Sequence, residues 1–202
     1  MQITTTALRG ADRSYSGHKT AEFAHDAHQL TLANFGTFSV SNNFGVWTVP
    51  EGRGAWIPAG MRHSIEPLPR AQTRTLYVSI RRSCEGAKAD RVAGAKAHSI
   101  VVLYVTPLMR AIVDHVCDPN ADRTTTGSKH LLAVFLDQFP HQRELPLFVP
   151  SLKSPLALRA AKALESDPAD TLRIHDLAVE LGVSDRTLER AFTADASMSL
   201  GE

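Results

Sequence analysis

The segment GVWTVPEGRGAWIPAGMRH, residues 45–63, concentrates glycine, proline and tryptophan and ends on His63. Glycine and proline form tight corners, so the backbone fixes the direction of this histidine. An imidazole held in this way supports one of two chemistries: it ligates a divalent metal ion, or it hydrogen-bonds a small organic molecule. Trp47 and Trp56 flank the corner, and for both a place in the barrel core is favoured over stacking on a ligand, because aromatic side chains dominate core burial.

A second informative segment is LRIHDLAVELGVSDRTLERAF, residues 172–192. Its apolar residues have helical spacing before Gly182 and again after Ser184, which predicts a helix, a three-residue turn and a second helix. A helix-turn-helix needs a small residue where the helices cross, a glycine in the turn and an apolar residue after it. Ala178, Gly182 and Val183 occupy these positions.

The second of these helices exposes a polar face that fits the major groove of DNA. We predict four DNA-binding residues there: Ser184, Arg186, Thr187 and Arg190. The arginines suit guanine edges or phosphates. A plain helical hairpin is the alternative, because helical turns with glycine are common. Residues 152–202 carry six Lys or Arg against nine Asp or Glu, a balance of −3, so non-specific attraction to phosphates is weak.

The hydrophobic pattern predicts a different scaffold for each segment. From about residue 23 to 80, short apolar–polar alternations are separated by turn signals such as NNFG and PAG, which predicts an all-β sandwich or barrel whose last strand is 73–80. A strand at 99–105 follows, and Thr106-Pro107 then caps and begins a helix. The apolar face of that helix is predicted to be Leu108, Ile112, Val113 and Val116.

A further helix is predicted at about residues 128–139, and its apolar face covers either the barrel or a dimer partner. That face consists of Leu131, Leu132, Phe135, Leu136 and Phe139. The polar segment 81–97 predicts a loop, and 141–155, with three prolines, predicts a linker. Ser154-Pro155 then caps and begins another helix.

Composition excludes several classes of protein. The formal charge of +1 gives no overall attraction to nucleic acid or membrane. Cys84 and Cys117 stand alone, which argues against a disulfide framework or zinc cluster and fits a reducing cytoplasm. The longest apolar run, 100–105, is far below the roughly 20 residues of a membrane helix. We expect a cytoplasmic protein with no membrane partner.

The segment LAVELGVSDRTLERAF, followed by SMSLGE, resembles the first helix-turn-helix of the AraC family of transcription regulators. WIPAGMRH and RTLY, residues 56–63 and 74–77, resemble the cupin sensor domain of one subgroup of that family. This resemblance covers most of the chain from about Phe23. Family members continue into a second helix-turn-helix, whereas this sequence stops at Glu202, and Ser197 stands where the family usually has glycine. We therefore expect a truncated member.

Cupins are small β-barrels with two motifs, and both align with this sequence. The second motif is matched by Gly52, Pro58, Gly60 and His63, with Pro67 in place of its asparagine. The first motif aligns as Gly17, Phe23, His25, Gln29 and Gly36. In this alignment Phe23 stands in place of the first histidine, and a phenyl ring cannot ligate a metal.

The cupin resemblance leaves His25, Gln29 and His63 as candidate ligands of a divalent metal, two imidazoles and a weak neutral amide. His18 and His28 are possible substitutes. The same three residues, together with Trp56, are candidates for a pocket that binds a small-molecule effector.

The resulting prediction is an α+β protein. A cupin-like β-barrel sensor occupies 1–105, a helical connector with possible dimerisation helices 106–150, and a partial AraC-type helix-turn-helix domain 151–202. The predicted function is not enzymatic: a homodimeric regulator that binds double-stranded DNA in response to a small molecule. The alternatives are a metal-dependent cupin enzyme, such as a dioxygenase or isomerase, and a truncated regulator with impaired DNA binding.

Overall fold

The structure of the protein is a computed structural model, and it divides into two compact units. The described residues are 7–79, 99–121, 125–139, 142–166 and 173–196. The first unit is Met1–Asn42 with Trp47–Phe148, and the second is Asn43–Val46 with Val149–Glu202. The predicted loop at 81–97, Cys84 and Ser197 lie outside the described residues. No helix in the described part of the chain is long and apolar enough to cross a membrane.

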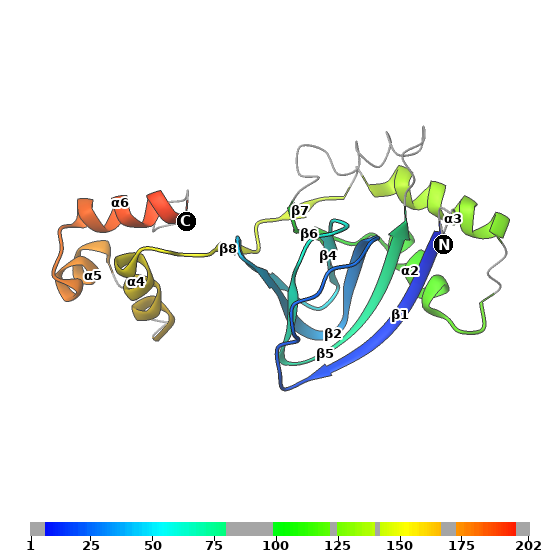
Figure 1. Ribbon diagram of the computed structural model, residues 1–202, viewed down its shortest axis with the longest axis horizontal. Coiled ribbons are helices and arrows are strands. Elements are labelled where there is room, and N and C mark those ends of the chain that lie inside the picture. The colour runs from blue at the N-terminus through cyan, green and yellow to red at the C-terminus, as the bar shows by residue number, and fades with distance from the viewer. Residues whose placement is uncertain (1–6, 80–98, 122–124, 140–141, 167–172, 197–202) are drawn as a thin grey trace. The chain divides into compact units, whose positions relative to one another are not determined.

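Eight strands in the described residues form one sheet, which Figure 1 shows as strongly curved. They are β1 (Ala7–Ser16), β2 (His28–Asn42), β3 (Gly45–Val49), β4 (Arg53–Ile57), β5 (Ser64–Ser79), β6 (Val101–Tyr104), β7 (Glu144–Leu145) and β8 (Phe148–Pro150). The strand order is β1-β5-β2-β4-β6-β7, and β3 pairs with both β2 and β8. The curvature gives the sheet an inner face and an outer face, in agreement with a cupin-like barrel.

The strands differ from the sequence prediction in three places. The sequence pattern did not indicate β1, an edge strand that pairs along its length with β5. This strand is polar and lacks an apolar pattern, and backbone hydrogen bonds hold it in the sheet. The predicted strand 73–80 is only the end of β5, which begins at Ser64. The predicted linker 141–155 contains the short strands β7 and β8, of which β8 ends at Pro150, and the boundary between the two units falls within it, after Phe148.

The long pair β2 and β5 bends at Gly36. Its register is irregular between Ala33 and Phe35 and again between Gly36 and Thr37. Gly36 has φ 71°, and a Cβ at this position would collide with the carbonyl oxygen of Arg70. Only glycine fits there without strain, so this motif glycine permits the bend between the two strands.

Two helices, α2 (Pro107–Cys117) and α3 (Thr125–Gln138), cover the outer face of the sheet (Figure 1). They and the sheet enclose what we call the helix-side core. It consists of Leu30, Leu32, Trp56, Leu76, Val78, Leu103, Val105, Met109, Ile112, Val113, Val116, Cys117, Leu132, Phe135, Leu136 and Phe139. The apolar faces of the two helices therefore pack on the barrel, which is one of the two alternatives that the sequence left open.

The start of α2 confirms its predicted cap and corrects its predicted face. The Thr106 hydroxyl accepts a hydrogen bond from the Met109 amide at 3.4 Å, with proline following at the first helical position. Leu108 is 46% exposed, whereas Met109 is fully buried. Met109 is three residues before Ile112 and so continues the buried helical stripe, while Leu108 is one residue out of phase.

The carboxyl end of α2 lies directly on β1 and β5. A Cβ at Gly10 would collide with the backbone of Val116 and Cys117, so glycine allows this close approach. Arg74 of β5 adds ion pairs to Asp12 of β1 at 3.3 Å and to Asp114 of α2 at 2.8 Å. Cys117 is a free, buried thiol whose pKa is raised to about 11 by burial. This cysteine is therefore a core residue and not a reactive one.

The inner face of the sheet encloses a second cluster, the barrel core. It consists of Ala33, Phe38, Val40, Trp47, Val49, Ala55, Ile57, Ile65, Ala71, Ile100 and Val102. In β2, Leu30 and Leu32 belong to the helix-side core, whereas Ala33 belongs to the barrel core. Successive side chains of a strand alternate between faces, so β2 separates two cores and is buried on both sides.

In its described residues the second unit contains three helices, α4 (Pro155–Ser166), α5 (Ile174–Leu181) and α6 (Asp185–Ala196). Their buried core is small and consists of Ala160, Leu177, Ala178 and Leu188. The Asp195 carboxylate of α6 accepts hydrogen bonds from the amides of Lys153 and Ser154 and so ties α6 to the start of α4.

The predicted helix ends in this unit are confirmed. Gly182 ends α5 in the left-handed conformation, with φ 72° and ψ 32°. The Ser184 hydroxyl accepts from the Thr187 amide at 3.2 Å and caps α6, and the Ser154 hydroxyl accepts from the Ala157 amide at 3.4 Å and caps α4.

Candidate functional site

The two segments that carry the candidate histidines are bonded to each other. Phe23 and His63 form a β-bridge, with the Phe23 amide donating to the His63 carbonyl at 3.0 Å and the reverse bond at 2.9 Å. The Gly60 amide donates to the His25 carbonyl at 2.8 Å. These backbone bonds bring together the sequence segments that resemble the two cupin motifs.

An aromatic cluster forms where the segments meet. The Phe23 ring lies 4.4 Å from the His63 ring and 5.2 Å from the His25 ring, centroid to centroid, and the two imidazoles are 6.2 Å apart. Tyr77 of β5 packs edge-on against His25 at 4.9 Å. Tyr77 was not among the residues predicted for the site, although it ends the RTLY segment and lies opposite Gln29 in the β2–β5 register.

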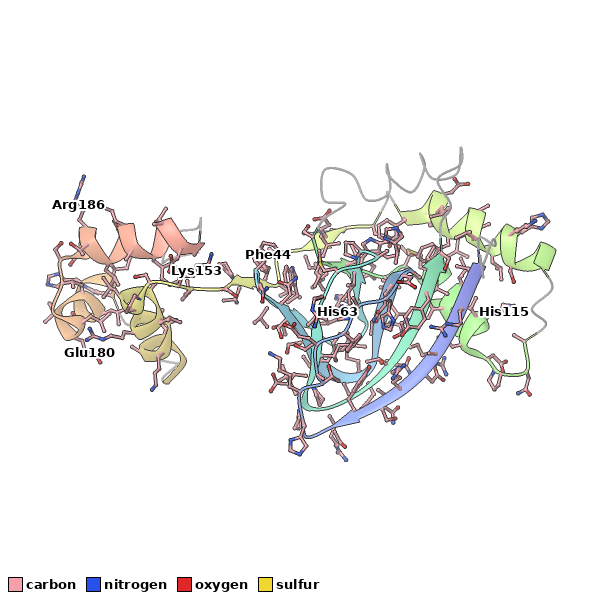
Figure 2. The ribbon with its side chains drawn as sticks, in the orientation of Figure 1. Phe44, His63, His115, Lys153, Glu180 and Arg186 are labelled. Atoms are coloured by element: carbon pink, nitrogen blue, oxygen red, sulfur yellow. The ribbon has the colours of Figure 1, made fainter. Side chains whose placement is uncertain are left out.

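His63 is buried with one ring nitrogen bonded and the other unpaired. It is 1% exposed, and its Nδ1 donates to the Met61 carbonyl at 2.9 Å. Burial lowers the pKa of His63, which keeps the ring neutral at pH 7. No group in the described residues pairs with Nε2, which therefore carries a free lone pair. Figure 2 shows His63 among the strands of the barrel.

Gln29 begins a row of polar side chains on the inner face. Its Nε2 donates to the Thr31 hydroxyl at 2.7 Å, and Thr31 lies 3.1 Å from the Thr75 hydroxyl. The Oε1 of Gln29 and the hydroxyl of Thr73 have no partner among the described residues. Gln29 is paired in register with Ile57, and Thr73 with Ala33, both members of the barrel core. Directly paired residues share a face, so these polar atoms lie on the barrel side of the sheet.

Trp56, the fourth residue predicted for the pocket, lies apart from this group. It belongs to the helix-side core, where its ring lies 4.5 Å from Phe139 and stacks on His28 at 5.3 Å. Its neighbours Ala55 and Ile57 lie in the barrel core, and strand alternation therefore turns Trp56 to the outer face. Both tryptophans are core residues, since Trp47 is buried in the barrel core.

The donors around His63 do not fit a metal centre. Within the described residues no three His, Cys, Asp or Glu side chains gather closely enough to bind one ion. The Phe23 ring contacts both imidazoles, and His28, a possible substitute, lies against Trp56 on the outer face. Metal sites normally have at least three good protein ligands. The arrangement instead suits hydrogen bonding to an organic ligand.

The histidines make the stability of the first unit depend on pH. The pKa of His25 is lowered by burial and by Arg13 and Arg9, with Asp26 opposing, and the pKa of His63 is lowered by burial. Below about pH 6.5 the unfolded chain therefore binds more protons than the folded protein. We expect the free energy of unfolding to fall as the pH falls below this value, as measured by urea unfolding at a series of pH values.

Two variants check which histidine carries this pH dependence. His63→Asn should lose less stability on acidification than the wild type, because one buried imidazole is gone. His130→Asn, which changes an exposed histidine of α3, is the matched control and should leave the dependence unchanged. Parallel curves for His63→Asn and the wild type would contradict this explanation.

The predicted DNA-binding residues lie on one exposed stretch at the start of α6. Ser184, Arg186, Thr187 and Arg190 are all exposed. Figure 2 shows Arg186 projecting away from the helices. Arg186 and Arg190 are one helical turn apart and therefore share a face. A contact of 3.2 Å between His175 Nδ1 and the Asp185 carboxylate joins the first turns of α5 and α6.

Comparisons with known proteins agree with this fold. Residues 6–114 match the family described as AraC-like ligand binding domain. The HTH-type transcriptional regulator NimR of Escherichia coli (strain K12) is 23% identical over 180 residues, which cover 87% of this chain and 60% of the relative. The chain therefore spans about three fifths of the length of this curated relative.

Two solved structures are also similar. The AraC-like transcriptional activator CuxR has a TM-score of 0.51 at 13% identity, covering 94% of this chain and 71% of that one, which shows a shared fold. ToxT from Vibrio cholerae has a TM-score of 0.47 at 9% identity, covering 92% of this chain and 76% of that one. Because the matched domain spans more than half of the 202 residues, the chain belongs to the family of proteins with an AraC-like ligand binding domain.

Proposed function

We propose that the protein is a transcription regulator that binds a small-molecule effector in its barrel and double-stranded DNA through α6. The observation that carries this proposal is the combination, in one chain, of an AraC-like ligand binding domain with two helices joined by a tight turn. Its similarity to NimR, which is named as an HTH-type transcriptional regulator, supports the same function. A regulator of this kind works in the cytoplasm and is not an enzyme.

On the ligand side, His25, Gln29 and His63 contact the effector. Two of them have buried polar atoms that lack a protein partner in the described residues. Such atoms are rare in native proteins because each unpaired atom lowers the stability of the folded state by about 1–3 kcal/mol. An effector that pairs with them would gain affinity from removing this cost.

On the DNA side, α6 is the reading helix. In a helix-turn-helix the first residues of the second helix face the base edges, and these are Ser184, Arg186, Thr187 and Arg190 here. One such helix buries too little surface for tight specific binding, since specific interfaces bury about 1,000 Å² or more of protein surface. A homodimer supplies a second reading helix, and light scattering coupled to size exclusion measures its mass.

Replacing either arginine of α6 should weaken specific DNA binding. We expect Arg186→Ala and Arg190→Ala each to raise the Kd by about 5- to 150-fold, which corresponds to the 1–3 kcal/mol of a base contact. Fluorescence anisotropy with fragments of the promoter adjacent to the gene measures the Kd at several salt concentrations. The salt series separates base contacts from phosphate contacts. Only the loss of a phosphate contact reduces the dependence of the Kd on salt concentration.

Arg159→Ala is the matched control. It removes the same charge from an exposed position on α4, outside the predicted reading helix. If it weakens binding as much as the α6 variants, the arginines of α6 do not read DNA. Absence of any complex at low salt would overturn DNA binding by this chain.

A metal-dependent cupin enzyme has one observation in its favour. His63 donates Nδ1–H to a backbone carbonyl, an orientation that metal-ligating histidines also adopt. The aromatic ring of Phe23 and the lack of a third good donor weigh against it. Near-stoichiometric iron or manganese in purified protein, lost in His63→Ala, would restore this alternative.

A further inference from the structure

The barrel interior is where most of the unpaired buried polar atoms of the described residues lie. Five buried side-chain atoms of the described residues lack a partner, and three of them, on Gln29, His63 and Thr73, lie on the barrel side. Their residues are only 2%, 1% and 2% exposed. Buried polar atoms that lack a protein partner on the same side of a sheet indicate that a bound molecule completes a site there.

The hydrogen-bonding character of two of these atoms is fixed by their neighbours. His63 donates its Nδ1–H to Met61, so its Nε2 is an acceptor. Gln29 donates from its amide nitrogen to Thr31, so its Oε1 is also an acceptor. A carboxylate would place lone pairs against these lone pairs, whereas a hydroxyl or N–H group donates to them.

The surroundings restrict the rest of the molecule. The Phe23 ring lies 4.4 Å from the His63 ring, and Phe23 itself packs on the barrel core, which favours a flat apolar body beside the acceptor. The Arg9 guanidinium lies 4.6 Å from the centre of the Tyr77 ring, and both Arg9 and Arg13 act electrostatically on His25, where Asp26 opposes them with a smaller effect. These two positive charges disfavour an ammonium group, so the donor is an uncharged one.

We propose that the effector is an aromatic molecule with an uncharged hydrogen-bond donor, a hydroxyl or ring N–H, which it presents to Nε2 of His63 with its ring against Phe23. This inference rests on the proposed effector binding in the barrel. It goes further by excluding molecules whose buried end is a carboxylate or an amine. It also assigns His63 the role of selecting between donors and acceptors.

Three probes of similar size test the proposal on the full chain without DNA. Phenol has the ring and the donor, anisole has the ring without the donor, and benzoate replaces the donor with an anionic acceptor. Ligand-observed NMR titration should give a Kd for phenol at least about tenfold lower than for anisole or benzoate, the effect of one buried hydrogen bond. Equal binding of phenol and anisole, or no binding of phenol, would overturn the proposal.

Variants of His63 locate the contact. In His63→Asn the shorter amide retains a donor for the Met61 carbonyl but has no atom at the Nε2 position. Phenol affinity should therefore fall about tenfold while anisole affinity stays unchanged. His28→Asn, on the outer face of the sheet, is the matched control. Unchanged phenol affinity in His63→Asn would contradict the assigned role.

This experiment distinguishes failure of the effector inference from failure of the proposed function. If the variant does not fold, as judged by circular dichroism, the ratio of phenol to anisole affinity in the wild type still decides the proposal. DNA binding without selectivity for phenol would overturn this inference and leave the DNA-reading function intact. Selective phenol binding without DNA binding would support the inference and count against the regulator.

Discussion

Replacing Leu188 with alanine is expected to unfold the helical unit and abolish DNA binding while the barrel stays folded. Leu188 is fully buried, and among the described residues its core has three other buried members, Leu177, Ala178 and Ala160. Removing a buried leucine side chain costs about 2–5 kcal/mol. A hydrophobic core in a unit of this size rarely supplies more than about 3–5 kcal/mol in total, so the substitution removes most of its stability.

Hydrogen exchange measured by mass spectrometry resolves this outcome by region. The amides of α4, α5 and α6 should lose protection in Leu188→Ala, and those of β2 and β5 should keep it. Val179→Ala is the matched control, because Val179 is 65% exposed on α5. Protected α6 amides in Leu188→Ala would show that these helices do not depend on this core.

Phe135→Ala should produce the largest loss of stability in the first unit. Phe135 is fully buried, with ring centroids 6.3 Å from Trp56 and 5.9 Å from Phe139. Deleting a buried phenylalanine ring costs about 3–5 kcal/mol, because the cavity that remains collapses only in part. We expect a lower Tm and a red-shifted tryptophan emission as Trp56 loses its packing.

The neighbouring substitution Val134→Ala provides the control, because Val134 is 42% exposed on the same helix. It should change neither the Tm nor the emission noticeably. If Phe135→Ala behaves like Val134→Ala, then α3 does not cover Trp56 in solution. The assignment of Trp56 to the helix-side core would then be wrong.

The candidate site shows where inference from the sequence succeeds and where it stops. The spacing of glycine, proline and histidine indicated His25, Gln29 and His63, and the structure brings the rings of His25 and His63 together beside the Phe23–His63 bridge. The spacing did not indicate Tyr77, and it did not show that Trp56 packs in the helix-side core. Which face a strand residue occupies depends on register, and a change of one residue reverses it.

The sequence by itself determined the starts of α2, α4 and α6 and the end of α5. The residues responsible contact groups within one helical turn of themselves, so a local sequence pattern is enough to predict their effect. They are Thr106, Ser154, Gly182 and Ser184. The tertiary structure alone decided that polar β1 joins the sheet and that α2 and α3 cover its outer face. It also decided that acceptor atoms of Gln29 and His63 remain unpaired on the barrel side. These features arise from contacts between residues far apart in the chain, which local patterns do not encode.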